Sequence, residues 1–345
     1  MDVDVDLLTA RAWNEGGEVV TLDARDERWV TGAATIGRHP YRFLYDPRPL
    51  WRQLRSGGHE VLDIHEEPAS LAAAEVLLLS WLARRTRPAV CLYSAQNIEK
   101  RYPVPFRWFE QLALRRAAAV HTCNDEAGRI LRRKGFRGTV LNLGLGVEID
   151  RFAPAGAESP TGTPPFDVLR VGYVGRLERH KGVEVLVDAV AALDGAELSV
   201  VGDGPEREAL TRQVARLGLS ERVSFRGFAD QADLPAVYRS FDVLVVPSLE
   251  TSSWIEQFGR VAIEAMSSGV AVVASDSGSL PEVVGGAGVL VPPGDAVALA
   301  AALQALTDDP ERRRELASAG RNRSRTYSWT AIAERQAELY AQVRP

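Results

Sequence analysis

The feature that most constrains the fold is a repeated pattern between residues 168 and 306, in which short Val-rich segments alternate with longer amphipathic ones. Val-rich runs are typical of strands buried in a parallel sheet, and apolar residues at three- and four-residue spacing indicate helices. The alternation therefore predicts an α/β fold whose parallel sheet is covered by helices on both faces. The predicted strands are 168–174, 198–201, 223–225, 243–246, 270–274 and 289–291, and the predicted helices are 183–193, 206–217, 234–241, 259–267 and 296–306.

The first half shows the same alternation less clearly, with predicted strands at 61–64, 89–93, 119–122 and 139–143 and a helix at 71–83. A chain of 345 residues is longer than one hydrophobic core usually serves, so two domains are expected. Residues 152–166 contain four prolines and two glycines, a composition that sustains neither a helix nor a central strand. We therefore predict domains at 1–151 and 167–328, a linker at 152–166, and a C-terminal helix at 329–345 that packs back towards the first domain.

Composition excludes several classes of protein. A net charge of -5 argues against a nucleic-acid partner, which a basic surplus would favour. Cys91 and Cys123 lie in apolar stretches and match no metal or redox spacing. The start lacks the basic region of a secretory signal, and no apolar run approaches the roughly 18 residues that span a bilayer. A cytoplasmic protein is expected, and the scarcity of lysine relative to arginine indicates a GC-rich bacterial genome.

Charge is unevenly distributed within the first half. Between residues 84 and 137 there are 13 Lys or Arg against 4 Asp or Glu. A solvated face of helices explains such a surplus, and so does contact with an anionic membrane surface or with an acceptor that carries phosphate. Peripheral membrane contact through residues 84–137 therefore stands as one of the open interpretations.

The most informative stretch is 245–272, where a buried strand ends in a polar loop and a helix is predicted to begin near Phe258. Glu256 lies just before this predicted helix and Glu264 eight residues later, two turns along, which on a helix places the two carboxylates within about 80° of each other around the axis. The backbone amides of Phe258, Gly259 and Arg260 would lie at a positive helix N-terminus, which suits a phosphate oxygen. The stretch therefore predicts a site for an elongated ligand that carries phosphate.

A second cluster follows the first strand of the same half, in residues 171–182. Arg176 and Lys181 come from the turn after Gly175, where a guanidinium and an ammonium can converge on a diphosphate. Cations and amides directed at a departing phosphate are the main catalytic device available without a metal ion. No histidine cluster is apparent in the sequence, and neither of these two stretches contains an Asp-x-Asp motif, so no metal site is expected.

These two clusters together resemble the donor-binding half of glycosyltransferase family 4. The family's E-x7-E signature is present as Glu256 and Glu264, and its G-R-x4-K-G pattern as residues 175–182. Further similar segments are 201–205, 223–227, 247–248 and 280–284, in the family's order. The resemblance implies a GT-B fold, in which two Rossmann-like domains face a central cleft, and a retaining, metal-independent glycosyltransferase with a nucleotide-sugar donor, UDP- or GDP-linked, and no other cofactor.

The resemblance also implies roles for individual residues. Arg176 and Lys181 would bind the donor diphosphate, Glu256 the transferred sugar and Glu264 the ribose, while Arg226 and Phe228 would flank the nucleobase. The implied catalytic residues are Glu256, Arg176 and Lys181. The implied donor-binding set is Gly175, Arg176, Lys181, Arg226, Phe228, Glu256, Phe258, Gly259, Arg260 and Glu264. Residues 167–328 would then be the nucleotide-sugar-binding domain and 1–151 the acceptor-side domain.

In the first half the resemblance is carried by polar residues that follow two predicted strands. His65 and Glu66 follow one, Gln96 and Asn97 follow the next, and all four are candidates for the acceptor side. Surface or helix-capping roles for His65 and Glu66 remain an alternative. Many relatives have a histidine where this chain has Gln96, so no histidine role is assigned there. Compared with the family, the first domain is expected to lack its first strand and helix.

Two other classes of function stay open. A binding protein could keep the donor site without turnover, and a GT-B nucleotide-sugar epimerase shares the architecture but would be expected to show its own acid and base carboxylates. The acceptor of a transferase is not encoded in any readable motif; a polysaccharide precursor, a glycolipid or a secondary metabolite would each fit. The oligomeric state is not indicated either.

Overall fold

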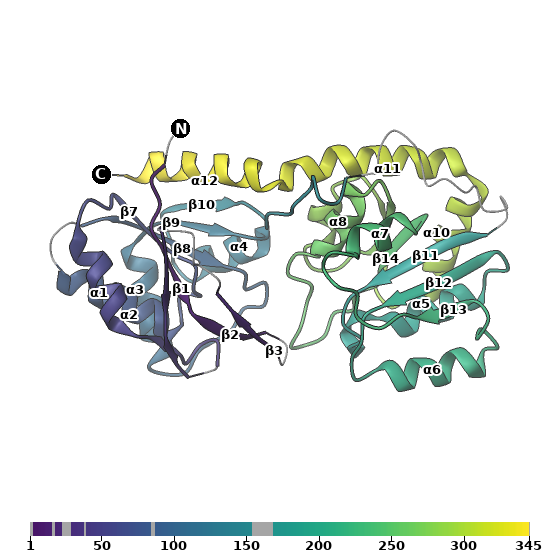
Figure 1. The fold of residues 1–345 in the computed structure, drawn as a ribbon, viewed down its shortest axis with the longest axis horizontal. Coiled ribbons are helices and arrows are strands. Elements are labelled where there is room, and N and C mark those ends of the chain that lie inside the picture. Colours follow the sequence, from purple (N-terminus) through teal and green to yellow (C-terminus); the bar gives the residue numbers. More distant parts are fainter. Residues whose placement is uncertain are drawn as a thin grey trace. The chain divides into compact units, whose positions relative to one another are not determined.

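The computed structural model describes residues 3–15, 18–22, 29–37, 39–83, 87–153 and 168–344. The chain divides into two compact units: unit 1 comprises Met1–Leu143 and Ala333–Pro345, and unit 2 comprises Gly144–Ile332. Figure 1 shows the chain coloured along its sequence, with the last helix, α12 (Trp329–Val343), in yellow. Because α12 contributes residues to both units, the end of the chain returns to the unit that contains its beginning.

Unit 2 is built on a six-stranded sheet with the order β13-β12-β11-β14-β15-β16, in which every neighbouring pair is parallel. The chain order reverses between β11 and β14, and ligands of open α/β sheets bind at such a switch point, beyond the carboxyl ends of the strands. The elements are β11 (Leu169–Val174), η1 (Arg179–Lys181), α5 (Val183–Ala191), β12 (Ala196–Val201), α6 (Arg207–Arg216), β13 (Val223–Phe225), α7 (Leu234–Arg239), β14 (Val243–Val246), α8 (Arg260–Ser267), β15 (Ala271–Ser275), α9 (Leu280–Val284), β16 (Val289–Val291), α10 (Ala296–Asp308), α11 (Pro310–Ser324) and η2 (Arg325–Tyr327).

Both faces of this sheet are buried, which explains why its strands are Val-rich. Alternate residues of β14 belong to different clusters: Val243 and Val245 lie in the core that includes α5, α6 and α10, whereas Leu244 and Val246 lie in the core that includes α7, α8 and α9. A strand that is apolar at every position is what a sheet covered on two sides requires. The parallel sheet and the covering helices predicted from the sequence are confirmed, with small differences in their bounds.

Unit 1 contains a four-stranded parallel sheet with the order β10-β9-β8-β7. Helices α2, α3 and α4 pack on one face, while Cys91 and Ala119 on the other face contact Leu339 of α12. The elements are β1 (Leu7–Ala10), β2 (Ala12–Glu15), β3 (Glu18–Thr21), β4 (Val30–Ala33), β5 (Thr35–Ile36), β6 (Leu44–Tyr45), α1 (Pro47–Ser56), β7 (Val61–Ile64), α2 (Leu71–Ala83), β8 (Ala89–Ser94), α3 (Phe106–Arg116), β9 (Ala117–Thr122), α4 (Asp125–Arg133) and β10 (Thr139–Asn142).

The strand pairing at the beginning of unit 1 was not predicted from the sequence. Strand β1 pairs in parallel with β4, and β2–β3 and β5–β6 form antiparallel pairs. The predicted linker, 152–166, lies outside the described residues from 154 onwards, and so do residues 84–86 of the cationic stretch. Among the helices of the described ranges, none is both long and apolar enough to cross a membrane.

Candidate functional site

The loops that follow β11 and β14 meet at one edge of the unit 2 sheet, because these strands are parallel neighbours. Lys181 ends the short helix η1 after β11, and Glu256 lies in the loop between β14 and α8. The Lys181 Nζ lies 2.9 Å from Oε2 of Glu256, and the two side chains are 25% and 12% exposed. The Ser248 hydroxyl donates to the same oxygen at 3.0 Å. The fold therefore brings together two of the three predicted catalytic side chains, which are 75 positions apart.

Aromatic side chains that the sequence did not single out hold the ammonium in place. The Lys181 Nζ lies 4.4 Å from the centroid of the Trp254 ring, and the His180 ring lies against the same indole, with centroids 4.0 Å apart. A cation over the face of an indole is stabilised by the negative face of the ring. Trp254 therefore belongs to the surroundings of Lys181, although no motif of the loop 249–255 signals it.

Two glycines allow the backbone to approach closely at this edge. Gly182 has a φ of +68°, and a Cβ at this position would lie 2.0 Å from the carbonyl oxygen of Pro247. Gly259 has a φ of +83°, and a Cβ there would lie 2.5 Å from Leu280. L-residues with a side chain rarely adopt this conformation. The turn that carries Lys181 is therefore packed directly on the backbone at the end of β14.

Helix α8 begins at Arg260, one residue after the predicted start at 259. Glu256 lies in the loop before α8 and is not helical, so the spacing of eight residues does not place Glu256 and Glu264 on one helical face. Phe258 is buried, with its ring 5.3 Å from that of Tyr327. Among the hydrogen bonds of the described residues, none is donated by the amides of Phe258, Gly259 or Arg260. These amides keep the donor capacity that a helix N-terminus offers to an anion.

Glu264 lies within α8 and is held by a buried tyrosine. The Tyr238 hydroxyl donates to Oε2 of Glu264 at 2.6 Å, and Tyr238 is fully buried. Burial raises the pKa of Glu264, although the bond from Tyr238 and the charges of Arg260 and Arg151 oppose that shift. The carboxylate is therefore oriented through one oxygen by a fixed donor.

The remaining predicted donor residues lie nearer the surface. Arg176 follows Gly175 at the end of β11, is 54% exposed, and pairs with Glu178 (Nε–Oε1, 3.0 Å) rather than with Glu256. Arg226 is exposed, and Phe228 is 74% exposed. A phenyl ring exposed to this degree is a surface on which a planar group can stack.

The four predicted acceptor-side residues of unit 1 all follow β7 or β8, but they differ in their partners. Glu66 accepts a hydrogen bond from the Tyr45 hydroxyl at 2.9 Å, and burial raises its pKa. The Gln96 side-chain amide donates to the Tyr41 hydroxyl at 2.7 Å. Asn97 is buried, whereas the side chain of His65 is 62% exposed.

Glu67 is a titratable group that no motif in the sequence indicates. Burial raises its pKa to about 7, although it accepts hydrogen bonds from the Ala95 amide and the Ser94 hydroxyl, both at 2.8 Å. These bonds join the loop after β7 to the end of β8. Nothing in the sequence His65-Glu66-Glu67-Pro68 indicates that the second carboxyl is buried.

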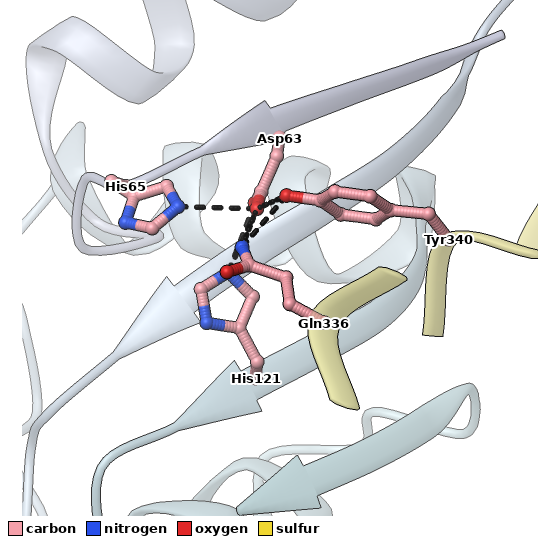
Figure 2. Close-up of polar contacts among 5 residues, drawn as sticks. All are labelled: Asp63, His65, His121, Gln336 and Tyr340. Atoms are coloured by element: carbon pink, nitrogen blue, oxygen red, sulfur yellow. Dashed lines mark hydrogen bonds and ion pairs between the residues drawn. The ribbon is translucent and has the colours of Figure 1, made fainter. Parts of the chain in front are cut away.

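A further cluster in unit 1 is centred on Asp63 of β7 (Figure 2). The Nε2 atoms of His65 and His121 lie 3.1 and 3.0 Å from its carboxylate, and Gln336 and Tyr340 of α12 donate to Oδ2 at 2.8 and 2.5 Å. Burial alone would raise the pKa of Asp63, but the hydrogen bonds from the two imidazoles outweigh it and hold the pKa below its usual range. No motif signals this cluster, because its members come from two non-consecutive strands and the C-terminal helix.

Comparison with known families covers nearly the whole chain in two parts. Residues 164–323 match the family described as glycosyl transferases group 1, and residues 1–144 match the glycosyl transferase 4-like domain. The chain is 31% identical over 305 residues to a phosphatidyl-myo-inositol mannosyltransferase of Mycobacterium leprae, covering 85% of this chain and 76% of that protein. It is 35% identical over 214 residues to a 2-deoxystreptamine glucosyltransferase of Streptomyces kanamyceticus, covering 58% and 54% of the two chains. The chain spans about half the length of most of the curated relatives it matches.

Solved structures share the fold. Sucrose-phosphate synthase of Thermosynechococcus elongatus is 28% identical, with a TM-score of 0.66 over 86% of this chain and 77% of that one. HepE of Anabaena, solved in complex with UDP, is 24% identical, with a TM-score of 0.72 over 85% and 82% of the two chains. These similarities confirm the α/β GT-B fold class predicted from the sequence.

Proposed function

Because the chain belongs to the glycosyltransferases of group 1, with a glycosyl transferase 4-like N-terminal part, we propose that it transfers a sugar from a nucleotide-sugar donor to an acceptor hydroxyl. The observation that carries this proposal is the pairing of Lys181 with Glu256 beside the N-terminus of α8. A cation, a carboxylate and a set of backbone donors at one sheet edge are the groups that a sugar diphosphate requires.

The proposed mechanism uses charge that the protein has already positioned. Lys181, Arg176 and the amides of residues 258–260 would stabilise the negative charge that develops on the diphosphate as the bond to the sugar breaks. Glu256 would bind the sugar, and Glu264, oriented by Tyr238, would bind the ribose. In this proposal the protein's own cations and amides make a metal ion unnecessary, and the sugar retains its anomeric configuration.

The relatives narrow the substrates that we propose. HepE has been solved with UDP and with UDP-glucose, so a UDP-linked donor is our first candidate and a GDP-linked one the second. Three relatives are named for transfer to inositol phosphate, phosphatidyl-myo-inositol and 2-deoxystreptamine, all of which contain a polyhydroxylated ring. We therefore propose a polyol of this kind as acceptor, with Glu66, Gln96, Asn97 and His65 on its side of the reaction.

A calorimetric titration of UDP, GDP, ADP and TDP, with and without Mg²⁺, tests the donor site. We expect one nucleotide to bind selectively and independently of Mg²⁺. Lys181→Ala and Glu256→Ala should abolish transfer, whereas Arg179→Ala, which removes an exposed charge from the same turn, should leave it unchanged. Full turnover in both site variants would refute the assignment. Tight binding without any transfer to polyols would instead favour a nucleotide-sugar-binding protein.

We also propose peripheral contact with anionic membranes through α3, which lies within the cationic residues 84–137, and through the end of α2, which precedes them. Trp81, Trp108 and Leu112 are 59%, 62% and 54% exposed, and α3 ends in Arg115 and Arg116. Aromatic side chains beside arginines suit the interface between headgroups and acyl chains.

Sedimentation with phosphatidylcholine vesicles, with and without phosphatidylglycerol, tests this surface. The chain should sediment only with the anionic vesicles, and Trp108→Ala should reduce the bound fraction. Trp329→Ala, which removes an equally exposed indole in unit 2, is the matched control. Binding that ignores lipid charge, or that responds equally to both variants, would rule the surface out.

A further inference from the structure

The cluster around Asp63 holds three side chains of the kind that bind transition metals. The carboxylate of Asp63 and the Nε2 atoms of His65 and His121 all lie within 4.8 Å of one another. Within the ranges that the structure describes, this is the one group of three His, Cys, Asp or Glu side chains that converges in this way. Zinc–nitrogen and zinc–oxygen bonds are about 2.0–2.2 Å long, so ligands around one ion lie roughly 3–4 Å apart. The Nε2 atoms of His65 and His121 lie 3.1 and 3.0 Å from the Asp63 carboxylate, close to this spacing.

The elements of unit 1 fix this arrangement. Asp63 lies in β7 and His121 in β9, and both strands border β8. The His65 ring is stacked on Tyr93 of β8, with centroids 5.8 Å apart, which restricts its rotation. Asp63 and His121 are 11% and 4% exposed, whereas His65 is 62% exposed. Two ligands are therefore held inside the fold, and the third lies at the surface, where an ion can enter and water can complete its coordination.

A second layer of hydrogen bonds orients the carboxylate. Gln336 and Tyr340 of α12 both donate to Oδ2 of Asp63, whereas Oδ1 is approached by His121 alone among the described contacts. Metal-binding carboxylates are commonly held by such outer partners, and the loss of one typically weakens metal binding by about 10- to 100-fold. Gln336 and Tyr340 therefore have the geometry of outer-shell groups, and they connect the cluster to the C-terminal helix.

From this geometry we infer a binding site for a divalent transition metal of the zinc class, with Asp63, His65 and His121 as ligands and solvent in the remaining position. Two imidazoles and one carboxylate suit Zn²⁺ or Co²⁺, whereas Mg²⁺ and Ca²⁺ prefer sets made of oxygen alone. The site goes beyond the proposed transfer reaction, because none of the proposed donor-binding residues is among its ligands and only His65 is shared with the proposed acceptor side. Its ion would join β7 to β9 and, through Asp63, to α12.

Cobalt provides a direct test, because Co²⁺ held by four ligands absorbs visible light much more strongly than hydrated Co²⁺, whereas Zn²⁺ does not absorb it. The full chain without an affinity tag is freed of metal with a chelator and titrated with Co²⁺, and the bound Co²⁺ is then displaced with Zn²⁺. We expect one equivalent per chain, displaced by Zn²⁺ and not by an excess of Mg²⁺. His65→Ala should weaken Co²⁺ binding at least tenfold, and because His65 is exposed, this variant should still fold. Gln336→Ala, which leaves all three ligands, should weaken binding by about tenfold.

His59 supplies the matched control. Its Nε2 lies 3.1 Å from Oδ2 of Asp6, the same contact that His65 makes with Asp63, but among the described residues it belongs to no cluster of three ligands. His59→Ala should therefore leave the affinity for Co²⁺ unchanged. The inference is overturned if the unaltered chain gives stoichiometric Co²⁺ no visible absorption beyond that of the hydrated ion, or if His65→Ala binds Co²⁺ as tightly as the unaltered chain does.

Discussion

Replacing Gly182 with alanine tests whether the turn that carries Lys181 is fixed by its packing on the end of β14. The residue has a φ of +68°, and an alanine Cβ would lie 2.0 Å from the carbonyl oxygen of Pro247. A left-handed conformation costs a residue with a side chain about 1–2 kcal/mol. Forcing an additional carbon into a packed site costs a further ~1–3 kcal/mol. The two effects together predict that Gly182→Ala lowers the free energy of unfolding by about 2–5 kcal/mol.

Gly218 separates the two contributions. It follows α6 with a φ of +70°, but nothing lies within 4 Å of the position that its Cβ would take. Gly218→Ala should therefore cost only the conformational term, about 1–2 kcal/mol. For a unit of this size, 1 kcal/mol lowers the midpoint of thermal unfolding by roughly 2–4 °C. Gly182→Ala should then lower the midpoint by about 4–20 °C and Gly218→Ala by about 2–8 °C.

The assay combines differential scanning calorimetry with hydrogen exchange in peptides that cover β14 (Val243–Val246). Faster exchange in β14 is expected for Gly182→Ala alone, because only that substitution displaces the backbone of Pro247. The affinity for the nucleotide should also fall in Gly182→Ala, because the position of Lys181 beside Glu256 depends on the contact between Gly182 and Pro247. Equal midpoints for the two variants, with equal exchange in β14, would show that the close approach of Gly182 to Pro247 does not hold the turn.

Two further predictions concern buried polar contacts of unit 2. Tyr238→Phe removes the hydroxyl that donates to Glu264. Because the carboxylate loses its fixed donor, the free energy of unfolding measured in urea should fall by about 1–3 kcal/mol. An unchanged free energy of unfolding would show that water replaces the hydroxyl. Asp242 accepts hydrogen bonds from the side chain and backbone of Arg170, and although burial opposes them, these bonds lower its pKa. Because the folded-state pKa of Asp242 is lowered, the Arg170–Asp242 pair stabilises the fold at pH values above the unfolded-state pKa of about 3.9. This stabilisation is lost as the pH falls below that value. Asp242→Asn should therefore lose less stability than the unaltered chain between pH 5 and pH 3, and equal losses would contradict the assignment.

The sequence predicted the sheet of unit 2 well because burial leaves a strong signal there. Strands β13, β14 and β16 have the predicted bounds, since each is a short apolar run between polar turns. The start of unit 1 lacks that signal. Strand β1 pairs with β4, which lies twenty residues further on, and its side chains are exposed or only partly buried. Such short, half-exposed strands are specified by their partners, and a single sequence does not show which partner each strand takes.

The donor site of unit 2 and the Asp63 cluster of unit 1 differ in the same way, because only the donor site leaves a signal in the sequence. The E-x7-E motif and the 175–182 turn are recognisable because each is a local motif that begins in the loop after a strand. The pairing of Lys181 with Glu256 then follows from the adjacency of β11 and β14. His180, Trp254 and Tyr238 were missed, because a side chain that positions another leaves no motif of its own.

Local sequence motifs do not predict the Asp63 cluster. Asp63 and His65 are two residues apart, so they project to the same side of their chain segment, but a single such pair is common and indicates no particular site. The cluster exists because β7 and β9 both border β8, which brings His121 to Asp63, and because α12 returns to the same sheet with Gln336 and Tyr340. Sheet order and the return of the last helix are properties of the whole chain. A site assembled by them is therefore visible only after the fold is known, even though each of its residues is of an ordinary metal-binding or hydrogen-bonding type.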